Sequence, residues 1–162
     1  MSGDRKLPAL MVARWFINHA DREAGEAITP LKLQKLVYYA DAWYLANFDK
    51  PLITEDFEAW AHGPAIPSLY GKYRDSGWNA LPPEEGSMPP KKHEDFLRAV
   101  FDEYGQYSAK KLEQMTHEET PWLEARGQLA PEAASKNKIS KLTMRNFYAG
   151  RLGKKPKKKL QD

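Results

Sequence analysis

Apolar residues recur every three or four positions over most of this chain, a spacing that predicts helices rather than strands. The first such stripe lies in residues 7–24 and predicts a helix that Gly25 ends. The second lies in residues 30–47 and is apolar on most sides, which is typical of a helix in the middle of a fold. Thr29 and Pro30 mark its start, because threonine can cap exposed amides and proline fits the first turn.

The same signals predict further helices in the rest of the chain. We expect a third helix from Pro67 to about Gly77, a fourth over residues 90–107, a fifth after a cap at Ser108, a sixth that ends at Gly127, and a last over residues 141–152. A chain of 162 residues fits one domain, so these helices should pack around one core.

Cap signals fix one of these helix starts and leave another open. Ser140 lies between Ile139 and Met144, at the spacing of a hydrophobic staple around a serine cap, and this predicts the start of the last helix. The sixth helix has two candidate starts. Thr116 has the spacing of a capping box, and Thr120 is followed by proline, as Thr29 is.

Two stretches depart from the helical period. Residues 53–61 alternate well enough for one short strand or extended segment, which a His-Gly-Pro turn at 62–64 follows. Residues 79–92 hold four prolines and a glycine and predict a surface loop. The expected fold class is mainly α: a single compact helical domain of about six to seven helices over residues 1–152, with a flexible lysine-rich tail over 153–162.

Composition and charge narrow the chemistry. The 162 residues include no cysteine, which excludes disulfides, thiolate catalysis and cysteine-ligated metal sites and fits a reducing cytoplasm. The first ten residues mix charges with a very short apolar run, so we expect neither a signal peptide nor a membrane span.

The positive charge of the chain is concentrated at its end. Six of the 25 cations and one of the 22 anions lie in residues 150–162, which leaves 19 cations and 21 anions in the preceding 149 residues. The net charge of +3 therefore comes from the tail, and it does not indicate a basic face on the body. Such a tail can aid solubility, contact phosphate, or dock an acidic partner such as a protease chaperone or a toxin.

An enzyme is the alternative that the polar residues leave open. Asp41, Glu58, His62 and His117 could in principle form an acid and base pair with a histidine. No nucleophile elbow, phosphate loop or paired-histidine metal motif supports that reading, and the histidines lack metal-ligand spacing. We expect no catalytic residues, no cofactor and no metal.

Four segments of the sequence carry a resemblance to a known family. They are LKLQKLVYYADAWYL, FEAWAHGPAIPSLYGKY, LEQMTHEETPWLEAR and ISKLTMRNFY, in that order. The chain resembles the Panacea domain of bacterial and phage antitoxins over residues 7–152, and among its members it is most similar to the SocA-like proteins. The resemblance implies a helical antitoxin that binds and blocks a cognate protein toxin. In SocA-like members it further implies a proteolytic adaptor that delivers the toxin to ClpXP through ClpX.

The second helix and the turn after it are the candidate toxin-binding surface, because Trp and Tyr anchor protein interfaces. The candidate residues are Gln34, Tyr38, Trp43, Trp60, His62, Gly63, Pro64 and Tyr70. The alternative is that they are core and turn residues, as helically spaced stripes usually are.

Two other functions compete with the antitoxin. A DNA-binding transcriptional regulator would use the basic tail, although nucleic acid is the least favoured partner of that tail because the acidic body offers no continuing groove. A small hydrolase would depend on His62. The sequence leaves the toxin, its target and the oligomeric state open.

Overall fold

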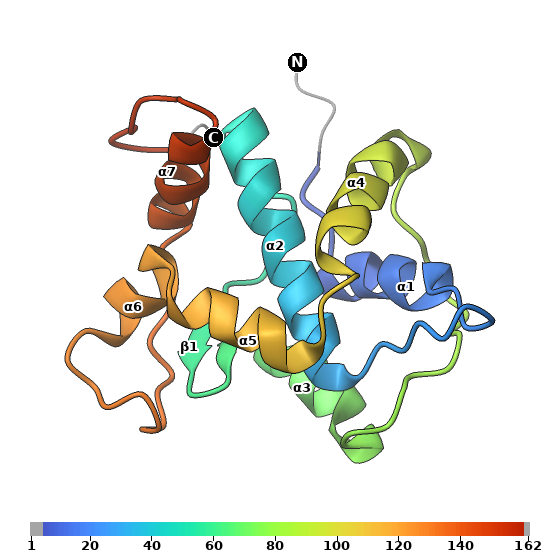
Figure 1. The fold of residues 1–162 in the computed structure, drawn as a ribbon. Coiled ribbons are helices and arrows are strands. Elements are labelled where there is room, and N and C mark those ends of the chain that lie inside the picture. Colours follow the sequence, from blue (N-terminus) through green and yellow to red (C-terminus); the bar gives the residue numbers. More distant parts are fainter. Residues whose placement is uncertain (1–4, 161–162) are drawn as a thin grey trace.

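The computed structural model describes residues 5–160, and within that range the chain folds into seven α-helices and one two-stranded sheet (Figure 1). This confirms the mainly helical fold class. The strands are β1 (Glu58–Trp60) and β2 (Gly63–Ala65), and the 3-10 turns are η1 (Arg74–Ser76) and η2 (Lys91–His93). The α-helices are α1 (Ala9–His19), α2 (Pro30–Phe48), α3 (Pro67–Tyr73), α4 (Glu94–Tyr104), α5 (Ala109–His117), α6 (Thr120–Arg126) and α7 (Lys141–Arg151).

Helix α2 runs through the centre of the molecule, as its all-round apolar surface predicts (Figure 1). Helices α1 and α4 pack on one side of it and α7 on another, while α3, α5 and β2 surround its N-terminal half. Its start is the predicted one, because Thr29 Oγ1 accepts a hydrogen bond from the Lys32 amide at 3.3 Å. It ends at Phe48, where Asp49 adopts the left-handed conformation with φ of 62°.

Three other helix starts test the cap signals. Ser108 Oγ accepts from the Lys111 amide at 3.0 Å, and Ser140 Oγ accepts from the Thr143 amide at 3.1 Å, so both serine caps are confirmed. The open choice for the sixth helix falls on Thr120, where α6 begins. Thr116 lies inside α5, and its hydroxyl donates to the Glu113 carbonyl at 2.7 Å.

Three predicted helices are too long. Helix α1 ends at His19, because residues 21–27 are exposed and the Asp21 carboxylate closes a turn by accepting from the Ala24 amide at 3.1 Å. Beyond α1, an apolar side chain such as Ala24 has no core to pack against. Helix α3 tightens into η1 before Gly77, and α4 is preceded by η2 and begins only at Glu94.

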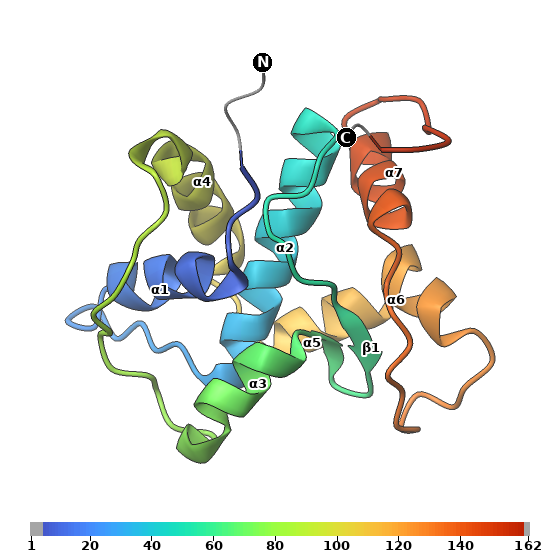
Figure 2. The same cartoon turned by 180° about the vertical axis from the view of Figure 1, so that it is seen from behind.

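The predicted strand is shorter than expected and has a partner that the sequence did not indicate. β1 pairs antiparallel with β2, with Glu58 opposite Ala65 and Trp60 opposite Gly63. On its other edge, the Ala59 amide donates to the Asn137 carbonyl at 2.8 Å, and residues 137–139 run alongside β1 toward α7 (Figure 2). The strand forms where a segment from nearly 80 residues away supplies this second edge, which local alternation cannot reveal.

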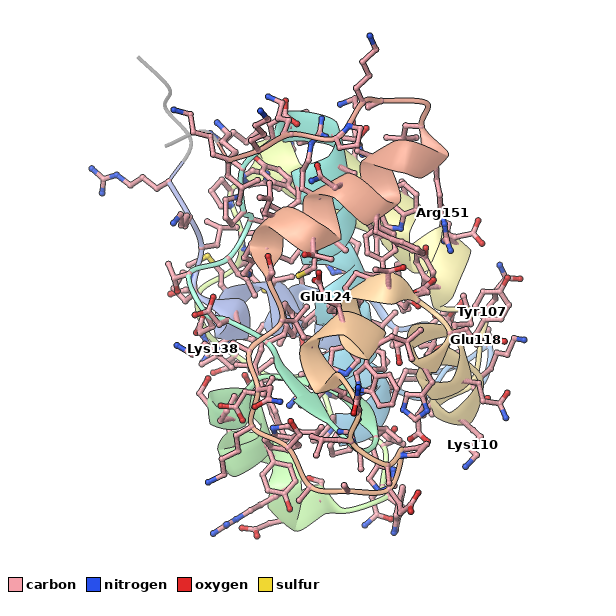
Figure 3. The ribbon with its side chains drawn as sticks, turned by 90° about the vertical axis from the view of Figure 1, so that its left-hand side faces the viewer. Tyr107, Lys110, Glu118, Glu124, Lys138 and Arg151 are labelled. Atoms are coloured by element: carbon pink, nitrogen blue, oxygen red, sulfur yellow. The ribbon has the colours of Figure 1, made fainter. Side chains whose placement is uncertain are left out.

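A buried carboxylate joins α2, α6 and α7. Glu119, which is 5% exposed, accepts hydrogen bonds from the hydroxyls of Tyr39 at 2.8 Å and Tyr148 at 2.7 Å. Burial raises the pKa of Glu119, although the two phenols and the nearby charge of Arg151 act in the opposite direction. Arg151 lies 3.3 Å from the second carboxylate oxygen and is partly exposed on the side of the molecule seen in Figure 3.

A second buried carboxylate, Asp41, fixes the chain that leaves α2. Asp41 is 0% exposed, and its Oδ1 accepts from the amides of Leu52 at 2.8 Å and Ile53 at 3.3 Å. Its Oδ2 pairs with the ammonium of Lys141 at the start of α7. Both of its carboxylate oxygens are therefore used in holding the fold.

The end of the chain lies against the body. The backbone carbonyls of Lys155 and Lys157 accept hydrogen bonds from Arg145 at 2.7 Å and Asn146 at 2.9 Å. The Lys154 ammonium donates to the Ala46 carbonyl at the end of α2 at 2.8 Å. Asp49 accepts from Arg145 at 2.8 Å and lies 3.0 Å from the Lys157 ammonium. The sequence predicts a solvated tail, whereas residues 154–157 are attached to the C-terminal end of α2 and to the side of α7.

Replacing Asp41 should test this anchoring. Asp41→Ala leaves the Lys141 ammonium and two amides without their acceptor, so we expect the free energy of unfolding to fall by about 3 kcal/mol or more. Urea unfolding measures the change. The control is Asp56→Ala, since Asp56 pairs with Lys138 at 3.5 Å on the surface and its loss should cost about 0.5 kcal/mol or less. Equal losses in the two variants would contradict the assignment.

Candidate functional site

A groove of about 340 Å³ opens between the start of α2, the β1–β2 hairpin and the α3–η1 segment. Its walls are mostly apolar. The aromatic part of this surface comes from four side chains, Trp60, Tyr70, Tyr73 and Trp78. A concave, largely apolar surface with a few polar groups is the usual form of a binding site.

Two polar side chains of α2 hold the floor of the groove. Gln34 Oε1 accepts from the Ile66 amide at 2.8 Å, and its Nε2 donates to the Ile66 carbonyl at 3.0 Å. Lys35 Nζ donates to the Pro64 carbonyl at 2.9 Å. In an antiparallel pair these are the backbone groups that point away from β1. The outer edge of β2 is therefore closed by α2 and offers no position for a further strand.

The close approach of Lys35 explains the glycine in the turn. Gly63 has φ of +99°, and a Cβ there would lie 2.7 Å from Lys35 Cε and 2.9 Å from Thr116 Oγ1. Both the conformation and the space thus require glycine. Lys35 is only 1% exposed. Burial lowers its pKa to about 7, and the charge of Glu113 acts against that shift.

The rim of the groove exposes aromatic surface. Trp78 is 81% exposed and Tyr70 is 50% exposed. The ring of Trp60 contacts that of Tyr70 edge to face, with centroids 5.2 Å apart. Trp60 is held in place because its indole nitrogen donates to Glu58 at 2.7 Å and its carbonyl accepts from Trp122 at 2.8 Å. The rim thus combines one fixed ring with two rings that are open to solvent.

His62 lies at the tip of the hairpin and at the edge of the groove. Its Nδ1 is 3.1 Å from Glu113 Oε1 on α5, and 74% of its side chain is exposed. Glu113 itself is buried and also faces the exposed Lys110 at 3.9 Å. Lys110 points outward on the side of the molecule shown in Figure 3.

The structure brings together five of the eight predicted site residues at this groove: Gln34, Trp60, His62, Gly63 and Tyr70. Pro64 is buried behind the floor, where its carbonyl accepts from Lys35. Tyr38 is 1% exposed, and its hydroxyl bonds that of Tyr148 at 3.1 Å, so it offers no surface to a partner.

Trp43 belongs to a different part of the molecule. Its indole nitrogen donates to the Tyr104 hydroxyl at 2.7 Å, and it lines a separate shallow hollow with Phe96 and Val100. The Tyr104 ring stacks on that of Tyr39 at 4.0 Å, which continues the buried network around Glu119. The side chain of Trp43 therefore connects the core with the surface of α4.

The acid and histidine residues considered for an enzyme have separate structural partners. Asp41 is used by Lys141 and two amides, and Glu58 accepts from Trp60. His117 stacks on Trp122 at 4.1 Å. Within residues 5–160 the acid and histidine side chains form no group of three or more that could hold a metal ion. In the same range no helix is long and apolar enough to span a membrane.

Sequence reasoning missed three residues that shape this groove: Lys35, Arg74 and Trp78. A lysine in an apolar helix is ordinarily placed on the surface, so its burial could not be read from the pattern. Trp78 had a usable signal, since it is a lone aromatic in the polar segment Ser76–Asn79.

Lys35 should make stability depend on pH. Its folded pKa of about 7 lies below the ordinary 10.5, so between these values the unfolded chain binds the additional proton and stability rises with pH. The slope should approach about 1.4 kcal/mol per pH unit and disappear below pH 7. Urea unfolding from pH 6 to 9 should show this rise in the wild type and not in Lys35→Met. Exposed Lys158→Met should retain it, and the same slope in Lys35→Met would contradict the assignment.

Two comparisons with known proteins bear on the chain. The family described as "Antitoxin SocA-like, Panacea domain" matches residues 33–123, from α2 into α6. Antitoxin SocA of Caulobacter vibrioides (strain NA1000 / CB15N) is 40% identical over 50 residues, which are 31% of this chain and 27% of that relative. The chain thus matches about a quarter of the length of this curated relative. No solved structure matches significantly.

The family match spans more than half of the 162 residues and includes α2 from residue 33 onward, the hairpin and α3. Every element that forms the groove thus lies in or directly beside the matched segment. The chain belongs to the SocA-like family of Panacea-domain antitoxins.

Proposed function

We propose that this chain is an antitoxin that binds a separately encoded protein toxin through the groove and its aromatic rim. Membership of an antitoxin family supports the class of function. The single observation that supports the location is the exposure of Trp78 and Tyr70 beside a mostly apolar groove. Tryptophan and tyrosine are enriched among the residues that dominate binding energy at protein interfaces.

The internal construction of the groove favours binding over chemistry. The side chains of Lys35 and Gln34 are hydrogen-bonded to the backbone of Pro64 and Ile66, and the imidazole of His62 pairs with Glu113. The polar groups therefore hold the shape of the surface. A rigid, preformed surface loses little conformational entropy when a partner docks on it.

Delivery of the toxin to ClpXP is the second part of the proposal, and it requires a second surface. The groove surrounds the N-terminal end of α2, whereas residues 151–159 lie at its C-terminal end, with the 19-residue helix between them (Figure 1). At about 1.5 Å per residue the two ends are roughly 28 Å apart. A toxin in the groove therefore leaves the basic segment free for an acidic partner such as a protease chaperone.

Substitution of Trp78 should remove toxin capture. The tagged chain is used to purify partners from extracts of its own host, and the co-purifying protein is identified by mass spectrometry. Trp78→Asp places a charge in the apolar contact, so we expect recovery of that protein to fall at least about tenfold. Leu129→Asp is the matched control, because Leu129 is a 43% exposed apolar side chain outside the groove. Equal recovery by both variants would rule out this surface.

Charge reversal at the other end of α2 should separate delivery from capture. The variant Lys155→Glu/Lys158→Glu/Lys159→Glu changes exposed side chains and should bind toxin normally. With purified ClpXP, ATP and the captured toxin, we expect it to slow toxin degradation at least about fivefold, since the charge of the contact is reversed. Loss of binding and degradation in parallel would refute the separate delivery surface.

A further inference from the structure

Among the described residues, the groove is lined by basic side chains and by no carboxylate. Its lining includes Lys35, His62 and Arg74 but no aspartate or glutamate. Lys35 is buried and bonded to the Pro64 carbonyl, so it makes no direct contact with a partner. Two carboxylates lie behind the lining. Glu58 accepts from the Trp60 indole nitrogen at 2.7 Å, and the buried Glu113 faces His62.

Arg74 is the charged group best placed to meet a partner. It caps α3, its side chain is exposed at the groove, and its guanidinium forms no ion pair with any described residue. The guanidinium geometry suits two parallel hydrogen bonds to a carboxylate. Asp75 is adjacent in sequence but does not line the groove.

The closed edge of β2 excludes one common mode of peptide recognition. Addition of a strand needs free backbone groups on an exposed edge. Here the Pro64 carbonyl and both backbone groups of Ile66 are already bonded to Lys35 and Gln34. A partner must therefore be recognised by its side chains, through apolar contact and charge.

We propose that the groove binds a short segment of the partner protein in which an aromatic or aliphatic side chain lies within two residues of an aspartate or glutamate. The apolar side chain packs between Trp60, Tyr70 and Trp78, and the carboxylate pairs with Arg74. This inference deepens the proposed function, because it specifies the chemistry of the toxin segment that the same groove binds.

The test uses a random twelve-residue display library panned against the full-length chain. The most enriched peptide is then synthesised as the probe, and its Kd is measured by calorimetry at low and at physiological salt. We expect enriched sequences to combine a large apolar residue with a nearby acid, and binding to weaken with salt. No enrichment, or enriched peptides without an acid, would overturn the inference.

Variants connect the probe to the groove. Trp78→Ala and Arg74→Glu should each raise Kd at least about tenfold, whereas Lys158→Glu makes the same charge change outside the groove and should leave it unchanged. A probe with its acid replaced by lysine should bind Arg74→Glu better than wild type. Circular dichroism confirms folding of these surface variants. Insensitivity of Kd to Arg74→Glu refutes the pairing, and because host toxin capture is measured separately, that result leaves the antitoxin proposal standing.

Discussion

The fold depends on one constraint: the central helix α2 is surrounded by protein, so each polar side chain it carries into the core must find a partner there. Gln34 bonds the Ile66 backbone, Lys35 the Pro64 carbonyl, Tyr39 the Glu119 carboxylate, and Asp41 the Lys141 ammonium. Buried polar groups without partners would cost several kcal/mol in total. Each of these partners comes from a segment distant in sequence, so the polar side chains of one helix specify where the hairpin, α6 and α7 must lie.

Much of the helical framework could be predicted from local sequence. The Thr29–Pro30 start and the caps at Ser108 and Ser140 were correct, because a cap is a contact between residues three apart. The hairpin could not be predicted in the same way. Its second strand lies on residues that also suit a turn, and its outer neighbour is the remote segment 137–139. Likewise, apolar residues continue at helical spacing past His19, but the chain leaves the core there and the helix ends.

The candidate groove was predicted only in outline. The turn residues and Tyr70 lie where the motif indicates, but helical spacing alone could not distinguish Tyr38, whose ring is enclosed, from an aromatic on the surface. Trp43 is intermediate, with its indole nitrogen tied to Tyr104. Conversely, a lysine is usually solvated, so the pattern gave no reason to place Lys35 beneath the hairpin. Which aromatic rings remain exposed depends on how α3 and the hairpin pack against α2. Helical spacing within one segment carries no information about that packing.

The contact between Gly63 and Lys35 has a consequence for how this surface can vary. The Lys35 side chain occupies the space that a side chain at position 63 would need. A substitution at either position therefore affects the other. Residues that share a space in this way show non-additive effects when substituted together. A randomised library meant to redirect the groove toward a new partner should therefore keep this pair constant and place its diversity on the solvent-facing rim.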